Sequence, residues 1–363
     1  MSSSIGKNLK ISIFGESHGR SIGVVVDGLP AGIPIDREDI LLDMARRRAG
    51  RKPGSTKRVE ADIPEIQSGV YEDHTTGTPL CAVIKNGDPH SQDYAALAGK
   101  PRPSHADYTS LVKYGGLQDL RGGGHFSGRL TAPLVFAGAV ARAYLKTQGV
   151  ACGSHIACIG GIWDAAFDPL NVDEKTLARL RKSDFPVLDA AQGREMAERI
   201  EEARMNKDSL GGIDECAVVG LPAGIGDPMF DGMESKIAAI LFGVPGVKGV
   251  EFGRGFAMAN LRGSEANDAM EMRDGKPAFL SNNSGGILGG ITSGAPLIVR
   301  ACFKPTASIA QEQSTVNMNT KEDCRIVIKG RHDSCITVRG LVAAEAAVMI
   351  AVADAMLEGS KRI

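Results

Sequence analysis

Three short segments of the chain bring imidazole, hydroxyl, carboxylate and guanidinium groups together beside glycine or proline. They are residues 15–19 (GESHG), residues 102–108 (RPSHADY) and residues 330–335 (GRHDSC). An imidazole exchanges protons near neutral pH, and a neighbouring carboxylate or hydroxyl can orient it. Glycine lets the backbone approach a ligand closely, because it has no side chain in the way. The three segments are therefore candidates for proton transfer at a bound ligand. A surface histidine is the alternative for His105, and pairing of the residues with one another is the alternative for residues 331–333.

Arginine, lysine and glycine dominate three further regions, which predict anion binding. They are the cluster at residues 46–48 (RRR) with Arg51, Lys52, Lys57 and Arg58 after it, residues 121–129 (RGGGHFSGR), and residues 282–290 (NNSGGILGG) with residues 304–308 (KPTAS). Glycines before a helix N-terminus expose backbone N–H groups to an anion, and arginine adds charge-assisted donors. Two alternatives stay open, since the cluster can be a solvated helix end and residues 282–290 can be two tight turns.

Other site classes fit the sequence less well. A serine hydrolase remains an alternative for residues 15–19. Residues 121–129 contain G-x-G-x-x-x-G, but no apolar strand precedes them, so the dinucleotide-binding fingerprint is not met. None of the seven histidines pairs with another histidine or with a cysteine at metal-ligand spacing, and we expect no metal.

Composition limits the partners and the compartment. The chain has 42 Lys and Arg against 43 Asp and Glu, so its overall charge does not attract nucleic acid or anionic lipid. No stretch offers the roughly 20 uncharged apolar residues of a membrane span, and no signal peptide is evident. Seven scattered cysteines without a CxxC pair are typical of reduced thiols. We expect a cytoplasmic protein that contacts neither nucleic acid nor membrane.

A six-residue sequence, GLPAGI, occurs at residues 28–33 and again at residues 220–225. Each copy follows an apolar run and precedes a segment with helical spacing, which we expect Asp36 and Asp231 to cap. The repeat predicts two related halves, with chance similarity of a short turn as the alternative.

The remaining elements predict the fold class. Patterns favour helices over residues 131–147, 189–205 and 341–357, and strands over residues 79–84, 297–303 and 325–328. Strands and helices do not alternate as βαβ units, so we expect an α+β fold with mainly antiparallel sheets. With 363 residues and 43% hydrophobic content, the chain can bury a large core.

Taken in their order along the chain, the six segments resemble the chorismate synthase family from Gly15 to Glu345. The most specific combination is residues 15–19 with residues 28–32, residues 102–108, and the RHD sequence at residues 331–333. The resemblance implies a β-α-β sandwich with an internal pseudo-two-fold repeat. It also implies one domain over residues 1–363, with halves of roughly 1–150 and 210–363, and a homotetramer.

The resemblance further implies a lyase of the shikimate pathway, which leads to the aromatic amino acids. Such an enzyme uses reduced FMN to eliminate phosphate from 5-enolpyruvylshikimate 3-phosphate in a trans-1,4 reaction that gives chorismate. An external flavin reductant is expected, with an intrinsic NADPH-dependent (NADP) reductase as the alternative. A non-catalytic flavin-binding or phosphometabolite-binding protein is a further alternative, against which the histidines and Asp333 argue.

Family positions imply a role for each candidate residue. Catalytic roles fall to His18 at the leaving phosphate, His105 beside the flavin, Asp333 in a proton relay, and Ser17 and Ser127 in support. The anionic groups of the substrate would be bound by Arg47, Arg48, Arg102, Arg129 and Arg331. The flavin would be held by His125, Phe126, Ser127, Glu234, Ser235, Gly289, Lys304, Pro305, Thr306, Ala307, Ser308 and Arg331.

Three regions depart from the commoner family sequence. Residues 125–129 read HFSGR, where the family more often has Arg-Ser-Ser-Ala-Arg, so one cation is lost. Pro53 stands at an expected basic position, for which Arg51 or Lys52 would substitute. Ser334 stands where proline is usual.

Overall fold

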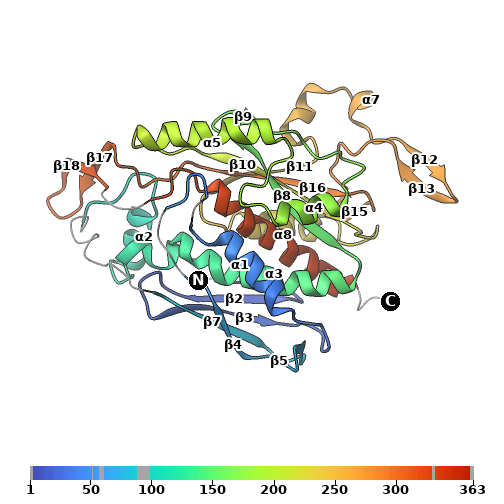
Figure 1. Cartoon of the computed structure of the whole chain (residues 1–363), viewed down its shortest axis with the longest axis horizontal. Helices are drawn as coiled ribbons and strands as arrows, with labels where there is room; N and C mark the ends of the chain where they lie inside the picture. Colours follow the sequence, from blue (N-terminus) through green and yellow to red (C-terminus); the bar gives the residue numbers. More distant parts are fainter. Residues whose placement is uncertain (1–2, 51, 57–60, 88–98, 329–331, 360–363) are drawn as a thin grey trace.

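Two antiparallel sheets enclose a layer of helices in the computed structural model, which describes residues 3–50, 52–56, 61–87, 99–328 and 332–359 (Figure 1). The first sheet has the order β1-β2-β3-β7-β4, and the second has the order β9-β8-β10-β16-β11. The strands of the first are β1 Ser4–Ile5, β2 Lys10–Gly15, β3 Ser21–Asp27, β7 Leu80–Lys85 and β4 Pro64–Ser68. Those of the second are β9 Ile162–Trp163, β8 Ala151–Ile159, β10 Gly212–Val219, β16 Leu297–Phe303 and β11 Val247–Phe252. The predicted α+β sandwich with antiparallel sheets is therefore confirmed.

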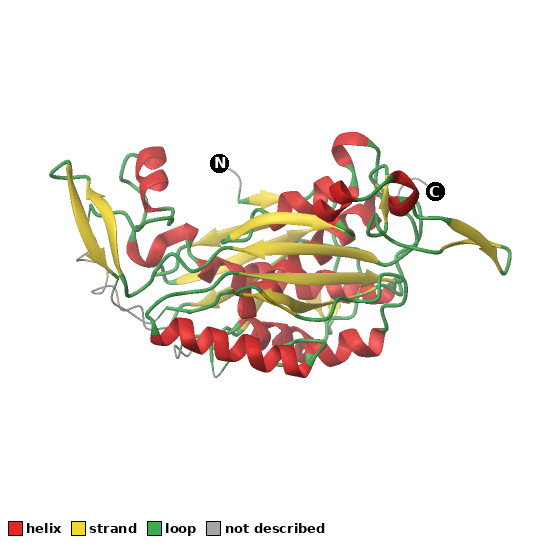
Figure 2. Cartoon of the chain, turned by 90° about the horizontal axis from the view of Figure 1, so that it is seen from above, coloured by secondary structure: helices red, strands yellow, loops and turns green. Residues whose placement is uncertain are grey.

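The helices are divided between the middle layer and the outside. Between the sheets lie α1 Arg37–Arg47, α3 Thr131–Thr147 and α8 Thr337–Gly359, and α6 Met233–Leu241 packs against α8 and β11. The outer face of the second sheet is covered by α4 Glu174–Arg181 and α5 Ala190–Met205 (Figure 1). Peripheral elements are α2 Asp107–Tyr114, α7 Gly263–Ala266, and the hairpins β5 Val70–Tyr71 with β6 His74–Thr75, β12 Met270–Arg273 with β13 Lys276–Phe279, β14 Ile287–Leu288 with β15 Ile291–Thr292, and β17 Glu312–Asn317 with β18 Glu322–Val327. Figure 2 shows two of these hairpins extending from opposite ends of the molecule.

The central helices α3 and α8 pack closely because their contact surface consists of small residues. A Cβ atom added to Gly138 would lie 2.3 Å from the Cβ of Ala346, so only glycine permits this approach. By length and composition α8 could cross a membrane, but 94% of its most apolar stretch is buried inside the fold. It is therefore a core helix, enclosed by both sheets, which explains its uniformly apolar sequence.

The two copies of the repeated sequence form the same turn. At the first copy, Thr75 Oγ1 accepts a hydrogen bond from the backbone of Ile33 (2.9 Å) and donates one to that of Pro30 (2.6 Å). Thr292 makes the same two bonds, 2.9 and 2.7 Å long, to the corresponding residues of the second copy. Four strands of each sheet also follow the same order, β2-β3-β7-β4 in the first and β8-β10-β16-β11 in the second. The boundaries of the two halves stay a prediction.

Only one of the two predicted helix caps is formed. Asp36 caps α1, and its carboxylate accepts hydrogen bonds from the backbone of Glu38 (2.9 Å) and Asp39 (3.2 Å). The prediction for Asp231 is wrong, because α6 begins after Gly232 and has no side-chain cap. Asp231 instead belongs to a short 3-10 turn before the helix.

Predictions from strong local patterns hold closely. The helix predicted over residues 131–147 is α3, and the strand predicted over residues 297–303 is β16. The predicted strands at residues 79–84 and 325–328 correspond to β7 and β18, with shifted ends. All seven cysteines are free thiols, as expected. The Sγ atoms of Cys152 and Cys216 lie 3.5 Å apart, far beyond the roughly 2.05 Å of a disulfide bond.

Glu345 is the centre of a buried ion network between α1, α3 and α8. Its carboxylate accepts hydrogen bonds from Arg46 Nη1 and Nη2 (2.8 and 2.9 Å), from Arg142, and from Ser154 Oγ (2.5 Å). Burial opposes the ionised form, but Arg46 and Arg142 outweigh it and lower the pKa of the Glu345 carboxyl. Paired in this way, the charges can remain buried in the core.

Three more ionisable groups are buried in β8 and β10, namely His155, Asp214 and Glu215. His155 lies between Asp164 (Nδ1–Oδ2 2.9 Å) and Glu215 (Nε2–Oε2 3.0 Å). Burial alone would lower the pKa of His155, but hydrogen bonds to the two carboxylates raise it. Asp214 is 1% exposed, and burial raises its pKa well above the usual value. Its Oδ1 atom has no hydrogen-bond partner among the described residues.

Candidate active site

Consecutive glycines separate the imidazoles of His18 and His105. These glycines belong to a 3-10 segment, Arg121–Phe126, where Gly122 and Gly123 have φ angles of 63° and 104°. A Cβ atom on Gly122 would lie 2.1 Å from His18 Cε1, and one on Gly123 would lie 3.2 Å from His105 Cε1. The backbone can therefore touch both rings only because these positions are glycine. Two segments that the sequence singled out separately meet here.

The position of His18 is fixed by the turn that follows β2. The Ser17 hydroxyl donates a hydrogen bond to Arg121 O (3.1 Å) and lies 3.0 Å from His18 Nδ1. The backbone N–H of Ser17 donates to Gly124 O (3.1 Å). Because the hydroxyl proton is directed to a carbonyl, Ser17 Oγ accepts from an Nδ1–H group of His18. Proton exchange with a ligand would then take place at Nε2 of this buried imidazole.

His105 belongs to a compact ionic group before α2. Its Nδ1 atom lies 2.6 Å from Asp107 Oδ1 and 3.1 Å from Arg102 Nη2. Arg102 Nε also donates to Asp107 Oδ2 (2.7 Å). Burial would raise the pKa of the Asp107 carboxyl, but hydrogen bonds from Arg102 and His105 hold it well below its usual range. A narrow cleft beside this group is lined by His105, Ala106, Asp107, Ser110, Asp119, Leu120, Gly123 and Phe126.

Two of the predicted substrate-binding arginines share one buried carboxylate. Arg47 Nη1 donates to Asp62 Oδ2 (2.6 Å), and Arg129 Nη1 donates to Asp62 Oδ1. Arg48 is half-buried and donates to Ala61 O (3.2 Å). Sequence reasoning missed Asp62, although an acidic residue soon after an arginine cluster is the kind of signal that would have found it.

Asp333 is held in place beside the end of α1. Its Oδ1 atom accepts from the backbone of Thr56 (2.7 Å), and its Oδ2 atom accepts from Arg339 Nη1 (2.7 Å). Arg339 Nε donates in turn to Arg47 O (2.9 Å). This chain of contacts connects Asp333 with the arginine pair at Asp62. Arg331 lies outside the described residues.

Lys52 is directed toward the helix that precedes it. Its Nζ atom donates to Ala45 O (3.2 Å) and to Arg46 O, so it satisfies carbonyl groups at the C-terminus of α1. Burial, together with Arg46 and other nearby cations, lowers the pKa of Lys52 to about 8. Lys52 is thus a basic group near the position that Pro53 occupies, whereas Arg51 lies outside the described residues.

One group of predicted flavin residues lies close to His105. Lys304 Nζ donates to Ser104 O, and Ser308 Oγ lies 3.5 Å from Arg102 Nη1. Burial and the nearby Lys248 lower the pKa of Lys304. The buried Oγ1 atom of Thr306 has no hydrogen-bond partner among the described residues. A cation and an unsatisfied hydroxyl in one loop suit a phosphate group.

The neighbouring residues His125, Phe126 and Ser127 have contacts within the chain. His125 lies between Gly15 O (2.8 Å from Nδ1) and Ser3 Oγ (2.8 Å from Nε2). Its ring therefore connects β2 with the Arg121–Phe126 segment, which we call the glycine segment. The ring of Phe126 lies 6.1 Å from that of Tyr114 and is 38% exposed. Ser127 Oγ accepts from Arg129 N (3.2 Å) and caps a short 3-10 turn.

The other group of predicted flavin residues is distant within one chain. Glu234 and Ser235 lie in the first turn of α6, and Gly289 lies beside Gly290, whose carbonyl accepts from Met233 N (2.8 Å). The next residue, Lys236, is 3.4 Å from Glu358 near the end of α8. With about 1.5 Å per helical residue, Glu358 is roughly 28 Å from Arg339 along α8. The two groups of predicted flavin residues are not brought together by a single chain.

The turn at residues 282–286 satisfies its own polar groups. Asn282 Nδ2 donates to Pro169 O and Pro296 O, both at 2.8 Å, and Asn282 Oδ1 accepts from Gly286 N (2.6 Å). Asp268 accepts from the backbone of Asn283 (2.6 Å) and Ser284 (2.9 Å). These contacts favour the tight-turn interpretation of this segment over a phosphate cradle.

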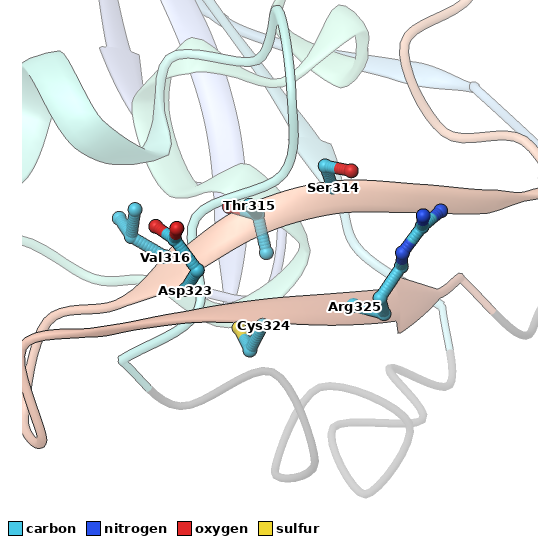
Figure 3. Close-up of a pocket in the computed structure, with 6 residues that line it drawn as sticks. All are labelled: Ser314, Thr315, Val316, Asp323, Cys324 and Arg325. Carbon is cyan, nitrogen blue, oxygen red and sulfur yellow. The ribbon is translucent and has the colours of Figure 1, made fainter.

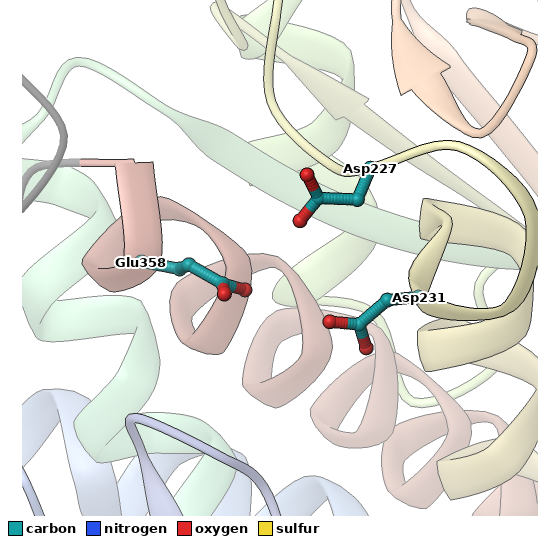
Figure 4. A group of neighbouring side chains, drawn as sticks. All are labelled: Asp227, Asp231 and Glu358. Carbon is teal, nitrogen blue, oxygen red and sulfur yellow. The ribbon is translucent and has the colours of Figure 1, made fainter.

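Two other features contribute no chemistry to this site. An open hollow on the β17–β18 hairpin is lined by Ser314, Thr315, Val316, Asp323, Cys324 and Arg325, none of them a predicted site residue (Figure 3). Asp227, Asp231 and Glu358 come close together near the end of α8 (Figure 4). Lys7 and Lys236 both form ion pairs with Asp231 and Glu358, so cations of the chain itself already balance this acidic group.

Comparison with known proteins identifies the family. The family model for chorismate synthase matches residues 9–357. The chorismate synthase of Dehalococcoides mccartyi is 44% identical over 98% of this chain and 97% of that protein. The chorismate synthase of Methanosarcina mazei is 44% identical over 97% of this chain and 95% of that protein. A crystal structure of a chorismate synthase superposes with a TM-score of 0.76 at 27% identity, covering 98% of this chain and 93% of that one.

The matches extend over nearly the whole chain, and they agree with a fold that gathers imidazoles, arginines and glycines around one region. A hydrolase or a dinucleotide-binding enzyme is therefore excluded for residues 15–19 and 121–129. The chain belongs to the chorismate synthase family and converts 5-enolpyruvylshikimate 3-phosphate into chorismate with reduced FMN as its cofactor.

Proposed function

We propose that the elimination takes place where the glycine segment separates His18 from His105, beside the arginine pair at Asp62. The observation that carries this proposal is the contact of both imidazoles with consecutive glycines. The substrate bears a phosphate and two carboxylates, so its site must supply both cations and proton-transfer groups. Those groups converge in this part of the described structure.

His18 acts on the leaving phosphate. As the bond from carbon 3 to the phosphate oxygen breaks, the oxygen takes the bonding electrons and gains negative charge. A proton or a hydrogen bond from His18 Nε2 stabilises that charge, while Ser17 holds the other ring nitrogen (3.0 Å). The anionic groups of the substrate are bound by arginines, which orient it for the reaction. These arginines are Arg47, Arg48, Arg102, Arg129 and Arg331.

The residues around the Lys304–Ser308 loop fit a flavin phosphate. We assign His125, Phe126 and Ser127, together with Lys304, Pro305, Thr306, Ala307 and Ser308, to FMN binding. The buried, unsatisfied hydroxyl of Thr306 and the ammonium group of Lys304 support this assignment. When bound, reduced FMN supplies electron density to the substrate transiently and recovers it, so the reaction has no net redox change.

Asp333 and His105 act in the removal of the proton from carbon 6 of the substrate. The hydrogen on carbon 6 must leave as the new double bond forms, and Asp333 receives it as part of a relay beside the flavin. Arg339 (2.7 Å) and the backbone of Thr56 (2.7 Å) fix the Asp333 carboxylate. His105, bound to Asp107 (2.6 Å), adjusts the protonation of the cofactor from the other side of the glycine segment, with Ser127 in support.

Anaerobic release of phosphate tests these roles. The purified protein is mixed with the enolpyruvyl substrate, with and without reduced FMN, and phosphate is measured over time. His18→Ala and Asp333→Ala should each lower turnover roughly 100-fold or more, as expected for a positioned proton-transfer group. The control is His74→Ala, because the His74 side chain is exposed and its Nδ1 atom lies 2.7 Å from the carbonyl oxygen of Glu72, two residues away. Near-native turnover by both site variants would refute the assignments.

We propose a homotetramer, and the separation of the flavin residues supports an assembly of more than one copy of the chain. Glu234, Ser235 and Gly289 lie at one end of α8, and the Lys304–Ser308 loop lies toward the other. A neighbouring copy of the chain is needed if both groups are to contact one flavin. Light scattering of the purified protein tests the assembly, and a monomer with full activity would contradict it.

We also propose that the chain relies on an external flavin reductant in the cytoplasm. We infer one domain with halves of roughly 1–150 and 210–363, and residues 121–129 do not follow the apolar strand that a dinucleotide-binding fingerprint requires. Consumption of NADPH by the protein and FMN alone, without a separate reductase, would favour the bifunctional alternative. Fractionation of cells that express the protein tests the compartment.

A further inference from the structure

The Asp62 carboxylate forms ion pairs with two cationic side chains that come from different elements. Its side chain has no exposed surface, and each carboxylate oxygen meets a different arginine. Arg47 is the last residue of α1, and Arg129 lies in the 3-10 turn before α3. Burial would raise the pKa of Asp62, but Arg47 and Arg129 lower it below the usual value. Asp62 is thus a buried anion whose partners hold it ionised.

The backbone conformation of Asp62 is also unusual. Its φ angle is 49°, in the left-handed region that residues other than glycine rarely adopt. Such a conformation persists where the surrounding contacts determine it, and it clusters at functional sites. The preceding carbonyl, of Ala61, accepts from Arg48 Nη1 (3.2 Å). Three arginines therefore contact this short segment.

Each of the two arginines also donates hydrogen bonds to other segments of the chain. Arg47 Nε donates to Thr131 Oγ1 (3.0 Å), and its Nη2 donates to Gly128 O (3.1 Å). Arg129 Nε donates to Asn86 Oδ1 (3.0 Å). The amide nitrogen of Asn86 donates to the carbonyls of Glu16 (3.0 Å) and Gly19 (2.8 Å), on both sides of His18. The carboxylate of Asp62 consequently connects α1, the start of α3 and the turn that carries His18.

We propose that Asp62 is a positioning residue, which holds Arg47 and Arg129 in one fixed arrangement before the substrate binds. Two guanidinium groups repel each other unless an anion lies between them. One carboxylate for two arginines leaves a net positive charge for the substrate and fixes the direction of both donors. Groups that are already oriented cost no reorganisation during the reaction. This inference rests on the substrate-binding role proposed for the two arginines.

The variant Asp62→Glu tests the position of the carboxylate independently of its charge. The longer side chain keeps the negative charge but moves the carboxylate by about 1 Å, a displacement that can cost 100-fold in catalysis. We expect kcat/KM for the substrate to fall at least 10-fold, with a rise in KM. Asp62→Asn, which keeps the shape and removes the charge, should also lower kcat/KM at least 10-fold. Rates are divided by the folded fraction measured by circular dichroism.

Asp43→Asn is the matched control. Asp43 is likewise 2% exposed, lies on α1, and bridges Arg46 (3.0 Å) and Arg142 (3.1 Å), which have no proposed contact with substrate. This variant should lower the melting temperature and leave the KM of the folded protein unchanged. A purely structural Asp62 would give that same result in its own variants.

Each outcome decides between the alternatives. The proposal fails if Asp62→Glu keeps kcat/KM within 3-fold of wild type, or if Asp62→Asn binds the substrate more tightly, which would make Asp62 only a neutralising charge. It fails too if neither variant folds, because Asp62 would then be essential to the fold. Arg47→Ala and Arg129→Ala are measured in parallel. If these leave KM unchanged, the role of the arginines is wrong, independently of Asp62.

Discussion

Substituting Gly122 with alanine tests whether the glycine segment positions His18. The added Cβ would lie 2.1 Å from His18 Cε1, 2.3 Å from Nδ1 and 2.8 Å from Ser17 Oγ. Carbon atoms in contact are normally about 3.5–4.0 Å apart, so the ring or the backbone must shift by roughly 1.5 Å. The φ angle of 63° adds strain of about 1–2 kcal/mol for a residue with a side chain.

A shift of this size should lower turnover by more than the accompanying loss of stability explains. A misplacement of about 1 Å can lower a rate roughly 100-fold, so turnover by Gly122→Ala should fall by about that factor. Gly149→Ala is the control, because Gly149 has a similar φ of 73° and an added Cβ would meet nothing within 4 Å. Both variants should lose stability through the strain of a positive φ angle, and Gly122→Ala should lose more because of its steric clash. Gly149→Ala should keep native turnover.

Anaerobic phosphate release gives turnover, and urea unfolding monitored by circular dichroism gives stability. Gly123→Ala, whose Cβ would lie 3.2 Å from His105 Cε1, should have a smaller steric effect than Gly122→Ala. The reasoning is refuted if folded Gly122→Ala turns over within 3-fold of wild type. It is also refuted if Gly149→Ala loses as much turnover as Gly122→Ala.

Three further predictions concern buried charges outside the site. Glu345→Ala should lower the free energy of unfolding in urea by about 3–5 kcal/mol, because it leaves two buried guanidinium groups without their shared carboxylate. Burial raises the pKa of the Asp214 carboxyl, which lowers the stability of the fold above the unfolded value near 4. Asp214→Asn should therefore be more stable than wild type in urea at pH 7, and this gain should vanish below about pH 4. The raised pKa of His155 stabilises the fold at low pH instead. This stabilisation is fully present below about pH 6.5 and is lost as the pH rises through the pKa that His155 has in the folded state. Urea unfolding of His155→Gln should therefore differ most from wild type below pH 6.5, and a difference that grows with pH would contradict this.

Local sequence patterns predicted the elements whose structure depends on local chemistry. The Ala-rich segment that became α3 and the apolar strand β16 have the predicted bounds, because helix propensity and a buried position act in the same direction there. Asp36 caps α1 because the helix begins directly after it. The same reasoning failed at Asp231, since a 3-10 turn and Gly232 intervene before α6. A capping residue can be predicted only when the helix start is known.

The candidate site could be predicted only in part. The residue types in each segment indicated proton transfer and anion binding, but their contacts depend on tertiary structure. Nothing local pairs Arg47 with Arg129, or shows that Asp62 lies between them. The charge balance of the site was also hidden, since Arg102 is bound by Asp107. The distance between Glu234 and the Lys304–Ser308 loop follows from the length of α8, which a list of motifs does not show.

The central claim is that one substrate molecule contacts His18 beside the glycine segment and is held by the arginine pair at Asp62. A crystal structure of the protein with 5-enolpyruvylshikimate 3-phosphate and oxidised FMN tests it most directly, because the elimination does not proceed without reduced flavin. We predict that a phosphate oxygen lies within about 3 Å of His18 Nε2 and that Arg47 or Arg129 donates to an anionic group of the substrate. A substrate bound elsewhere, with both imidazoles out of reach, would contradict the account.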